Sequence, residues 1–314
     1  MTSGDEVVHP HDVGMDEHKL SAFKEAFANE PVKSWLISKN GKNITNDQTL
    51  SERKELHTLN SITKSILSIL IGKAVEQRYI SSIQVPLQEI FPQHSLRDEK
   101  KDITIEHLLT MTSGLQGPER SDIQINDNLL GTIFDQPLAY SPGEKMTYNN
   151  HDSHVLSAII REVTGMNTDE YAHSVLFEAL EIEEYAWKKD RQGTAIGGFG
   201  LKLNPYDLLR IGNFMLQKGK WKNEVLLSND WIEEATKSQV ETDIRQQKYG
   251  YHWWINNNVR GDNNNFYYAA GRGGNFLFVV PDKSLVAAFT GEFNAKESLK
   301  PYQWFVRYIL PAFE

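Results

Sequence analysis

The sequence predicts a mixed α/β protein of the α+β class, in which an antiparallel sheet flanked by helices carries a mainly helical inserted domain. Strand-like runs lie at both ends of the chain, and segments with helical periodicity fill its centre. No internal repeat and no linker rich in Pro and Gly separates these parts. We therefore expect residues 1–60 together with 240–314 to form the sheet domain with terminal helices, and residues 61–239 to form the helical domain. The active site is expected in the cleft between them.

The individual elements follow from local patterns along the chain. The opening dozen residues are polar, and we expect them to be disordered. Residues 15–29 place their apolar side chains on one helical stripe, and residues 32–38 form a strand whose partner begins at residues 43–45. The stretch 61–237 is mostly helical and is interrupted by Gly and Pro. The remaining expected elements are strands at 249–255, 266–270, 276–280 and 285–290 and a closing helix at 304–313.

The composition excludes several classes of function. The chain of 314 residues holds 33 basic and 42 acidic side chains, a net charge of −9, so it lacks the clustered positive charge that a nucleic-acid partner requires. It contains no cysteine, which excludes disulfide frameworks, thiol nucleophiles, iron–sulfur clusters and cysteine zinc sites. A hydrophobic content of 39% is enough for a sizeable core.

The sequence carries no sign of export or of a membrane anchor. The N-terminus has neither the basic segment nor the apolar segment of a secretory signal. The longest apolar stretch, near residues 66–71, is far shorter than the roughly 20 residues that a bilayer span requires. We therefore expect a cytoplasmic protein without a membrane partner. The sequence does not predict an oligomeric state.

The pattern Ser-x-x-Lys occurs three times and supplies the candidate nucleophile. Without cysteine, a covalent nucleophile must be Ser, Thr, Lys or a carboxylate, and the Gly-x-Ser-x-Gly elbow of α/β-hydrolases is absent. The first copy lies on an amphipathic surface helix, the second lies in a charged run, and the third opens a helix that is apolar nearly all round. In this order, the copies are Ser21 with Lys24, Ser51 with Lys54, and Ser61 with Lys64.

Ser61 and Lys64 are therefore the strongest candidates for catalysis. Residues three apart share a helical face, so the Lys64 amine is expected one turn from the Ser61 hydroxyl. Burial and the positive end of the helix both disfavour the charged ammonium, which lowers the pKa of Lys64 toward that of a general base. The pattern leaves an alternative open, in which Ser61 caps the helix and Lys64 extends into solvent.

A second element is Tyr148-Asn149-Asn150, the only Tyr-x-Asn in the chain. A tyrosine has an ordinary pKa near 10, so Tyr148 needs a neighbouring cation to act as a base, and Lys64 would be that cation. Asn150 would present its side-chain amide to the substrate and to Lys64. The alternatives are a core tyrosine and an asparagine that caps the following helix.

The third element is the Gly-rich segment at residues 268–276. The small residues Ala270 and Gly271 at a strand margin let a substrate approach the backbone closely. The amide N–H of Arg272 would then pair with that of Ser61 as an oxyanion hole. An ordinary hairpin turn is the alternative for this segment.

Together these elements resemble the serine β-lactamase and penicillin-binding-protein superfamily, and within it the class C-like branch of esterases and amidases. The resemblance covers nearly the whole chain. It implies a β-lactamase/transpeptidase-like fold and a small-molecule ester, amide or β-lactam as substrate. Besides the three elements, it includes phrases typical of the superfamily at residues 105–115, 141–144, 197–201 and 249–254.

The resemblance also implies a mechanism. Ser61 attacks a carbonyl group, and Lys64 and Tyr148 relay its proton. The amides of Ser61 and Arg272 hold the oxyanion. Water then releases a covalent acyl-enzyme, and neither a metal nor an organic cofactor is required. The other residues that border the substrate are Asn150, Ala270 and Gly271.

The third motif departs from the superfamily pattern. Its usual form is Lys-Thr-Gly or His-x-Gly, whereas this chain has Ala269-Ala270-Gly271, so the cation that often receives a β-lactam or peptide carboxylate is missing. Relatives with Ala-x-Gly resemble esterases and hydrolases of short linear amides, including 6-aminohexanoate-dimer hydrolase, and this is the activity we expect. The alternatives are a β-lactamase or D,D-carboxypeptidase, and a catalytically silent ligand-binding domain with the same fold.

The histidine pair near residue 151 and the loop at 116–136 lie outside the three elements. His151 and His154 share a helical face but have no third ligand at a supportive spacing, so no metal site is predicted. The walls of the substrate pocket are expected in the 116–136 loop, whose folded shape the sequence does not predict.

Overall fold

One large sheet is assembled from both ends of the chain. The computed structural model describes residues 7–44, 55–94, 96–244, 247–256 and 265–313, and within them nine strands form one sheet in the order β1-β3-β2-β14-β13-β12-β11-β10-β9. All neighbours are antiparallel except β1 and β3, which are parallel. The strands are β1 (Val7–Val8), β2 (Val32–Lys39), β3 (Lys42–Ile44), β9 (Val240–Glu241), β10 (Lys248–Tyr249), β11 (Trp254–Asn256), β12 (Phe266–Gly271), β13 (Asn275–Val280) and β14 (Leu285–Gly291).

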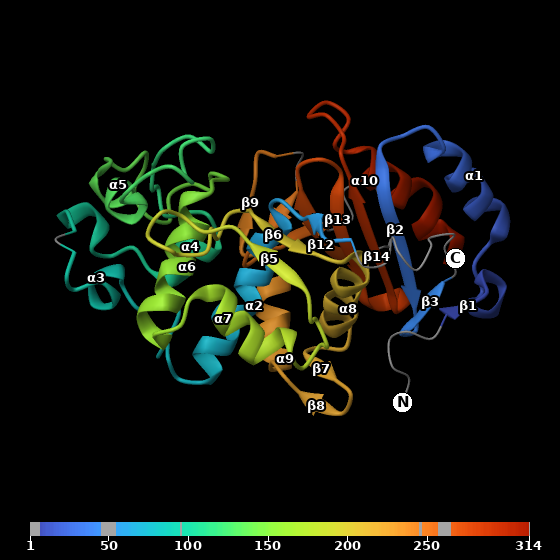
Figure 1. Cartoon of the computed structure of the whole chain (residues 1–314), viewed down its shortest axis with the longest axis horizontal. Coiled ribbons are helices and arrows are strands. Elements are labelled where there is room, and N and C mark those ends of the chain that lie inside the picture. The colour runs from blue at the N-terminus through green and yellow to red at the C-terminus, as the bar shows by residue number, and fades with distance from the viewer. Residues whose placement is uncertain (1–6, 45–54, 95, 245–246, 257–264, 314) are drawn as a thin grey trace.

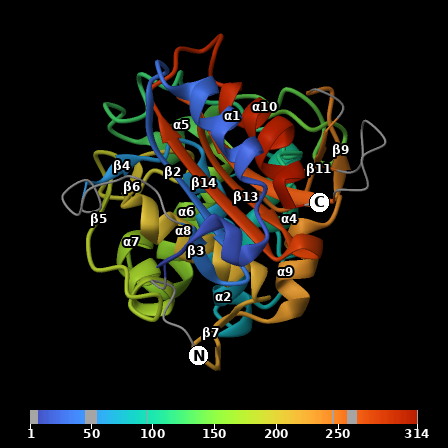
Figure 2. The same cartoon turned by 90° about the vertical axis from the view of Figure 1, so that its right-hand side faces the viewer.

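Helices cover both faces of this sheet. On one face lie α1 and the C-terminal segment that begins with α10, and on the other lie α2 and α8 (Figures 1 and 2). Helices α3 to α7 lie beyond α2, on the left of Figure 1. The helices are α1 (Glu17–Phe27), α2 (Ile62–Glu76), α3 (Leu87–Ile90), α4 (Ile105–Leu109), α5 (Leu129–Asp135), α6 (His151–Thr164), α7 (Thr168–Ala172), α8 (Pro205–Leu216), α9 (Asn229–Thr236) and α10 (Lys300–Trp304).

Shorter elements complete the described part of the chain. Three strands form a small sheet in the order β4-β6-β5, and two more form a hairpin. The strands are β4 (His57–Thr58), β5 (Tyr185–Trp187), β6 (Leu201–Leu203), β7 (Lys220–Trp221) and β8 (Glu224–Val225). The 3-10 turns are Pro10–Val13, Asp98–Lys100, Pro281–Lys283 and Leu310–Phe313, and the π-helical turns are His173–Phe177 and Phe305–Ile309.

The core follows from the alternation of side chains along the central strands. In β13, Phe276 and Phe278 contribute to the cluster beneath α1 and the C-terminal helices, whereas Leu277 and Val279 join the cluster beneath α2 and α8. Phe278 stacks on Phe305 with ring centroids 3.9 Å apart. Because both faces are covered, the strand is apolar at every position after its first residue, which explains why the sequence signal for this strand is clear.

The predicted fold class is confirmed, and three local predictions differ from the structure. The stretch 249–255 is not one strand, because His252 adopts a φ of 60° and donates its backbone N–H to the Leu109 carbonyl, which separates β10 from β11. The centre of the chain is not only helical, since it contributes to the small sheet. Residues 7–12 are ordered by β1 and a 3-10 turn, and residues 1–6 lie outside the described ranges. The division into two domains stays a prediction.

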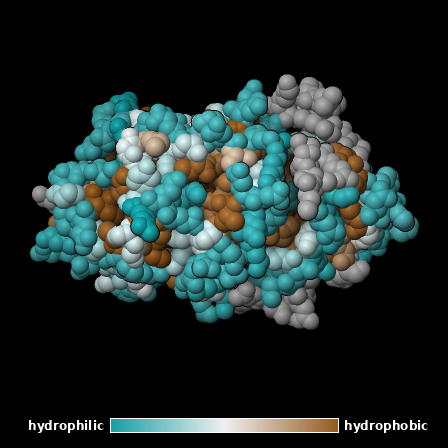
Figure 3. All heavy atoms as spheres, turned by 90° about the horizontal axis from the view of Figure 1, so that it is seen from below, coloured by the Kyte–Doolittle hydropathy of each residue, from teal (hydrophilic) through white to brown (hydrophobic). Residues whose placement is uncertain are grey.

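The surface seen from below in Figure 3 is mainly hydrophilic. Apolar residues show there as separate patches framed by hydrophilic ones. In the part of the chain that the structure describes, no helix combines the length and the apolar character that crossing a bilayer demands.

A matched pair of valines tests this account of the core. Val279 is fully buried in β13, whereas Val225 in β8 is 64% exposed. We expect Val279→Ala to lower the free energy of unfolding by about 1 to 3 kcal/mol, because the methyl groups it removes leave a cavity. The same change at Val225 should alter it by less than about 0.5 kcal/mol. Urea unfolding measures both, and equal effects would contradict the assigned core.

Candidate active site

Ser61 stands at the start of the most deeply buried helix. Every residue of α2 from Ile62 to Gly72 is buried, because this helix passes between the sheet and the helices of the centre. Asn60 adopts a left-handed φ of 51° immediately before it, which turns the chain sharply into the helix. The Ser61 side chain makes no capping hydrogen bond. The alternative in which Ser61 merely caps α2 is therefore wrong, and its hydroxyl is available for other contacts.

The Lys64 side chain points inward and is only 1% exposed. Its Nζ lies 2.6 Å from the Gly198 carbonyl oxygen, 2.8 Å from Asn150 Oδ1 and 3.3 Å from Ser61 Oγ. Two of these three partners are carbonyl oxygens, which only accept hydrogen bonds. The alternative in which Lys64 extends into solvent is wrong, since its amine is held beside the Ser61 hydroxyl.

Burial dominates the electrostatics of this amine. Desolvation holds the pKa of Lys64 well below its ordinary value of 10.5, the positive charge of Arg120 lowers it further, and Asp152 opposes the shift. A charged ammonium costs much more than a neutral amine in such surroundings. The direction that the sequence predicts for the Lys64 pKa is therefore found in the structure.

Tyr148 lies over the same amine. Its ring centroid is 4.9 Å from Lys64 Nζ, and its other face stacks on Trp254 at 5.6 Å. Burial raises the pKa of Tyr148 to about 12, and a hydrogen bond with Ser61 and the charge of Arg120 oppose this rise. The Lys64 amine therefore lies beside the tyrosine, and the charge of Arg120 also acts on the phenol. The role of Lys64 as the cation for Tyr148 stays a prediction.

Asn150 faces Lys64 and does not cap α6. Its side chain makes no capping hydrogen bond, and the amide oxygen of Asn149 accepts from the Asp152 backbone N–H in its place. The Asn150 oxygen and Gly198 approach so closely that a Cβ added to Gly198 would lie 2.7 Å from that oxygen. Glycine at this position lets the backbone carbonyl reach Lys64.

The margin of β12 touches the start of α2. A Cβ added to Gly271 would lie 2.2 Å from the Leu59 carbonyl oxygen and 3.2 Å from the Ser61 backbone nitrogen. Among the described residues, the backbone N–H groups of Ser61 and Arg272 have no backbone acceptor. Ala270 precedes this contact and packs in the same apolar cluster as Tyr148. The β12–β13 hairpin therefore brings the backbone directly before Arg272 against the start of α2.

Arg120 belongs to the site, although no sequence signal marked it. It comes from the segment before α5, since residues 116–136 form a loop that runs into this helix, and its Nη2 donates to Asn60 Oδ1 at 2.8 Å. Asn60 Nδ2 in turn donates to the Arg272 carbonyl at 2.7 Å, so one side chain links the loop to the β12–β13 turn. The Arg272 side chain itself is exposed. A lone arginine in a loop carries no pattern, and only the fold brings it to the nucleophile.

Two buried titratable side chains, Asp152 and His252, lie near the site and are hydrogen-bonded to their neighbours. Asp152 is fully buried, accepts from the Ser113 hydroxyl and has its second oxygen without a described partner. Burial raises the pKa of Asp152 to about 7. His252 faces the Leu109 carbonyl with Nδ1 and the Ser153 hydroxyl with Nε2, both at 3.0 Å, so Nδ1 donates and Nε2 accepts. Burial, followed by the charge of Lys64, lowers the pKa of His252 to about 3, which keeps its ring neutral.

The other candidates lie apart from this site or outside the described residues. Ser21 is exposed on α1, whereas Ser51 and Lys54 are outside the described ranges. His151 contacts the Pro118 carbonyl at 3.0 Å, and His154 pairs with Asp190 at 3.2 Å. Within the described residues, no group of three His, Cys, Asp or Glu side chains is arranged to hold a metal ion.

Comparison with known proteins identifies the family. The beta-lactamase family model matches residues 25–302, which is most of the chain. The chain belongs to the beta-lactamase family. The members of this family are generally hydrolases. The motifs that contain Ser61, Tyr148 and Gly271 all lie within the matched residues.

Solved structures share this fold at low sequence identity. A penicillin-binding protein homologue from Pyrococcus abyssi, described as octameric, is 20% identical with a TM-score of 0.74, covering 95% of this chain and 78% of that one. A candidate 6-aminohexanoate-dimer hydrolase from Bacillus anthracis is 18% identical with a TM-score of 0.77, covering 92% and 81%. EstCE1, a hydrolase with promiscuous acyltransferase activity, is 14% identical with a TM-score of 0.76, covering 95% and 98%.

The buried carboxyl of Asp152 makes a prediction about stability and pH. Its pKa is about 7 in the folded chain against an ordinary 3.8, so its ionisation destabilises the folded state as pH rises through this window. His252 acts in the opposite direction, because its pKa is lowered to about 3 and stability rises with pH up to its ordinary value of 6.5. Asp152→Asn removes only the first effect. We expect the stability of this variant relative to wild type to rise between about pH 4 and 7, by at most about 4 kcal/mol.

Urea unfolding at several pH values measures this difference. The control is Asp243→Asn, which removes a carboxylate that is 93% exposed. A difference between Asp152→Asn and wild type that stays flat over this pH range would show that Asp152 is ionised in the folded chain.

Proposed function

We propose that the chain is a serine hydrolase of small esters or amides that acts through a covalent acyl-enzyme on Ser61. The proposal rests on the three contacts of the Lys64 amine. A neutral amine has two N–H groups and one lone pair. Two carbonyl oxygens occupy the N–H groups, so the lone pair is directed at the Ser61 hydroxyl, as a general base requires.

Acylation then follows from the positions of these groups. Ser61 Oγ forms a bond to the substrate carbonyl carbon, and its proton passes to the Lys64 amine. The backbone N–H groups of Ser61 and Arg272 hold the negative charge that develops on the carbonyl oxygen. The bond from carbon to the leaving group breaks, and the leaving group receives the proton from Lys64 through the Tyr148 hydroxyl.

Deacylation reverses the proton path. Water attacks the ester carbon and gives its proton to Lys64, the bond to Ser61 Oγ breaks, and Ser61 regains its proton. Because the pKa of Tyr148 is raised to about 12, the phenol is protonated at neutral pH. Tyr148 therefore acts as a relay with its hydroxyl proton and not as a phenolate base.

The third motif of this chain favours esters and short amides over β-lactams. The strand beside Ser61 offers Ala269, Ala270 and Gly271, and none of these carries the cation of the usual third motif. Two structural neighbours support the same substrate class, because they are described as EstCE1, a hydrolase, and as a candidate 6-aminohexanoate-dimer hydrolase.

A fluorophosphonate probe and a short-chain nitrophenyl ester test the proposal. We expect wild type to be labelled on one serine and to hydrolyse the ester. Ser61→Ala should abolish labelling and lower turnover by about a thousandfold or more, because the nucleophile is removed. Ser21→Ala is the matched control, since Ser21 is also followed by a lysine three residues later but is exposed on α1.

Two outcomes would contradict this proposal. One is that wild type neither labels nor turns over while a related hydrolase does so under the same conditions. The other is that labelling survives in Ser61→Ala. A penicilloyl adduct on Ser61, detected by intact mass, together with slow ester turnover would favour a β-lactamase or D,D-carboxypeptidase.

The contact between β12 and α2 makes a second prediction. In Gly271→Ala the new methyl group would collide with the Leu59 carbonyl, which forces the strand and the Arg272 amide away from Ser61. We expect ester turnover to fall about tenfold to a hundredfold, since small displacements of catalytic groups cost this much. Gly165→Ala is the control, because its added methyl meets no atom within 4 Å although its φ is 73°. That variant should lose about 1 kcal/mol of stability but keep its turnover. Unchanged turnover in Gly271→Ala would remove the oxyanion role from the Arg272 amide.

A further inference from the structure

We propose that Arg120 and Arg272 form an anion-binding subsite beside Ser61, so that the preferred substrate is an ester or amide carrying a carboxylate. This inference rests on the proposed function and adds the substrate class to it. It replaces the missing cation of the third motif with one that a different segment of the chain supplies. Arg120 acts as the specificity-determining residue, and Arg272 assists it.

Arg120 is fixed in place and keeps most of its donors. One N–H donates to Asn60 Oδ1 at 2.8 Å, and the guanidinium lies 4.0 Å from the centroid of the Phe199 ring. The remaining N–H groups have no acceptor among the described residues. A guanidinium held on an aromatic face with a free fork of donors is suited to bind a carboxylate through two hydrogen bonds.

The two arginines lie close together, and no described carboxylate neutralises their positive charges. Burial and the nearby charge of Arg272 both lower the pKa of Arg120. Among the described residues, neither guanidinium has a carboxylate within salt-bridge distance, although the chain has a net charge of −9. Arg120 is half-buried and Arg272 is exposed. Their like charges repel each other, and an anion bound between them would relieve this repulsion. The arrangement therefore fits a negatively charged ligand.

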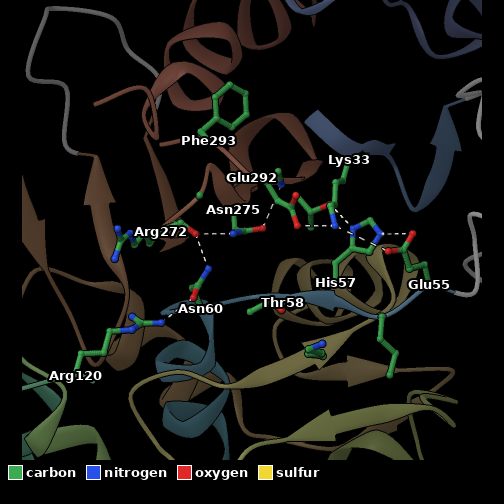
Figure 4. Close-up of a pocket in the computed structure, with 15 residues that line it drawn as sticks. Lys33, Glu55, His57, Thr58, Asn60, Arg120, Arg272, Asn275, Glu292 and Phe293 are labelled. Carbon is green, nitrogen blue, oxygen red and sulfur yellow. Dashed lines mark hydrogen bonds and ion pairs between the residues drawn. The ribbon is translucent and has the colours of Figure 1, made fainter. Parts of the chain in front are cut away.

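A cavity connects these arginines with the surface. It has a volume of about 460 Å³, and Asn60, Arg120 and Arg272 lie together at one side of it (Figure 4). At its other end Lys33 pairs with Glu292 at 2.7 Å, so the charges there compensate each other. Figure 4 shows Asn60 between the two arginines, bonded to the side chain of one and to the backbone of the other. Asn60 directly precedes Ser61 in the chain, and the charge of Arg120 acts on both Lys64 and Tyr148, so the guanidinium lies near the candidate nucleophile. Ser61 itself does not line this cavity.

Matched pairs of substrates test the subsite. The first pair is 4-nitrophenyl valerate and mono-4-nitrophenyl glutarate, in which a methyl group of the acyl chain is replaced by a carboxylate. The second pair is methyl 4-acetoxybenzoate and 4-acetoxybenzoate, in which the leaving group carries the charge. In at least one pair, we expect wild type to prefer the charged member in kcat/KM. Arg120→Gln should lower kcat/KM for that member by about tenfold to a hundredfold more than for its neutral partner.

Two controls complete this experiment. Arg97→Gln removes the same charge from an exposed residue outside the cavity and should leave the preference unchanged. Calorimetric titration of monomethyl glutarate into Ser61→Ala, with and without Arg120→Gln, measures anion binding when no hydrolysis occurs. We expect binding that Arg120→Gln weakens by about tenfold or more.

The outcomes separate this inference from the proposed function. If neutral esters are hydrolysed through Ser61 but neither pair shows a charge preference, or Arg120→Gln affects both members equally, the subsite is refuted and the hydrolase stands. If no ester is hydrolysed but the titration shows binding that depends on Arg120, the subsite stands and the hydrolase is refuted. The absence of both hydrolysis and binding refutes the two together.

Discussion

The site depends on one buried amine. Lys64 projects from a helix that is apolar nearly all round, and an amine in such a position must find acceptors or cost several kcal/mol. The carbonyl of Gly198 and the side chain of Asn150 supply them, so the segment before β6 and the start of α6 are tied to α2. The same burial lowers the pKa of Lys64 well below its ordinary value, and it holds the amine beside the Ser61 hydroxyl.

The geometry of the site also depends on two places where backbone segments approach each other closely. Gly198 and Gly271 each stand where a side chain would collide with the neighbouring segment. Both glycines therefore set distances between segments that are remote in the sequence, one at the amine and one at the nucleophile. Asn60 adds a third link, because its amide joins the Arg120 side chain to the Arg272 backbone. The candidate catalytic groups are thus held by contacts between segments more than by any one helix or strand.

Sequence patterns predict those helices and strands whose formation depends on neighbouring residues in the chain. The strands at the C-terminal end and helix α2 are predicted because their side chains are apolar over long runs, and spacing alone indicates the Ser61 and Lys64 pair. Arg120 is not predicted, since its place depends on how a loop folds over distant residues. Whether Lys64 is charged depends on burial, which the sequence of one helix does not determine.

The order of the strands also bears on how the chain folds. Strand β2, near the N-terminus, pairs with β14, near the C-terminus, so the centre of the large sheet joins residues about 250 positions apart. Contacts of such long range form late, because closing a long loop costs entropy before any pairing is gained. During synthesis, β2 must wait for nearly all of the polypeptide to emerge. Gly271 reaches Ser61 only from that completed sheet, so the proposed active site is assembled only when nearly the whole chain has emerged.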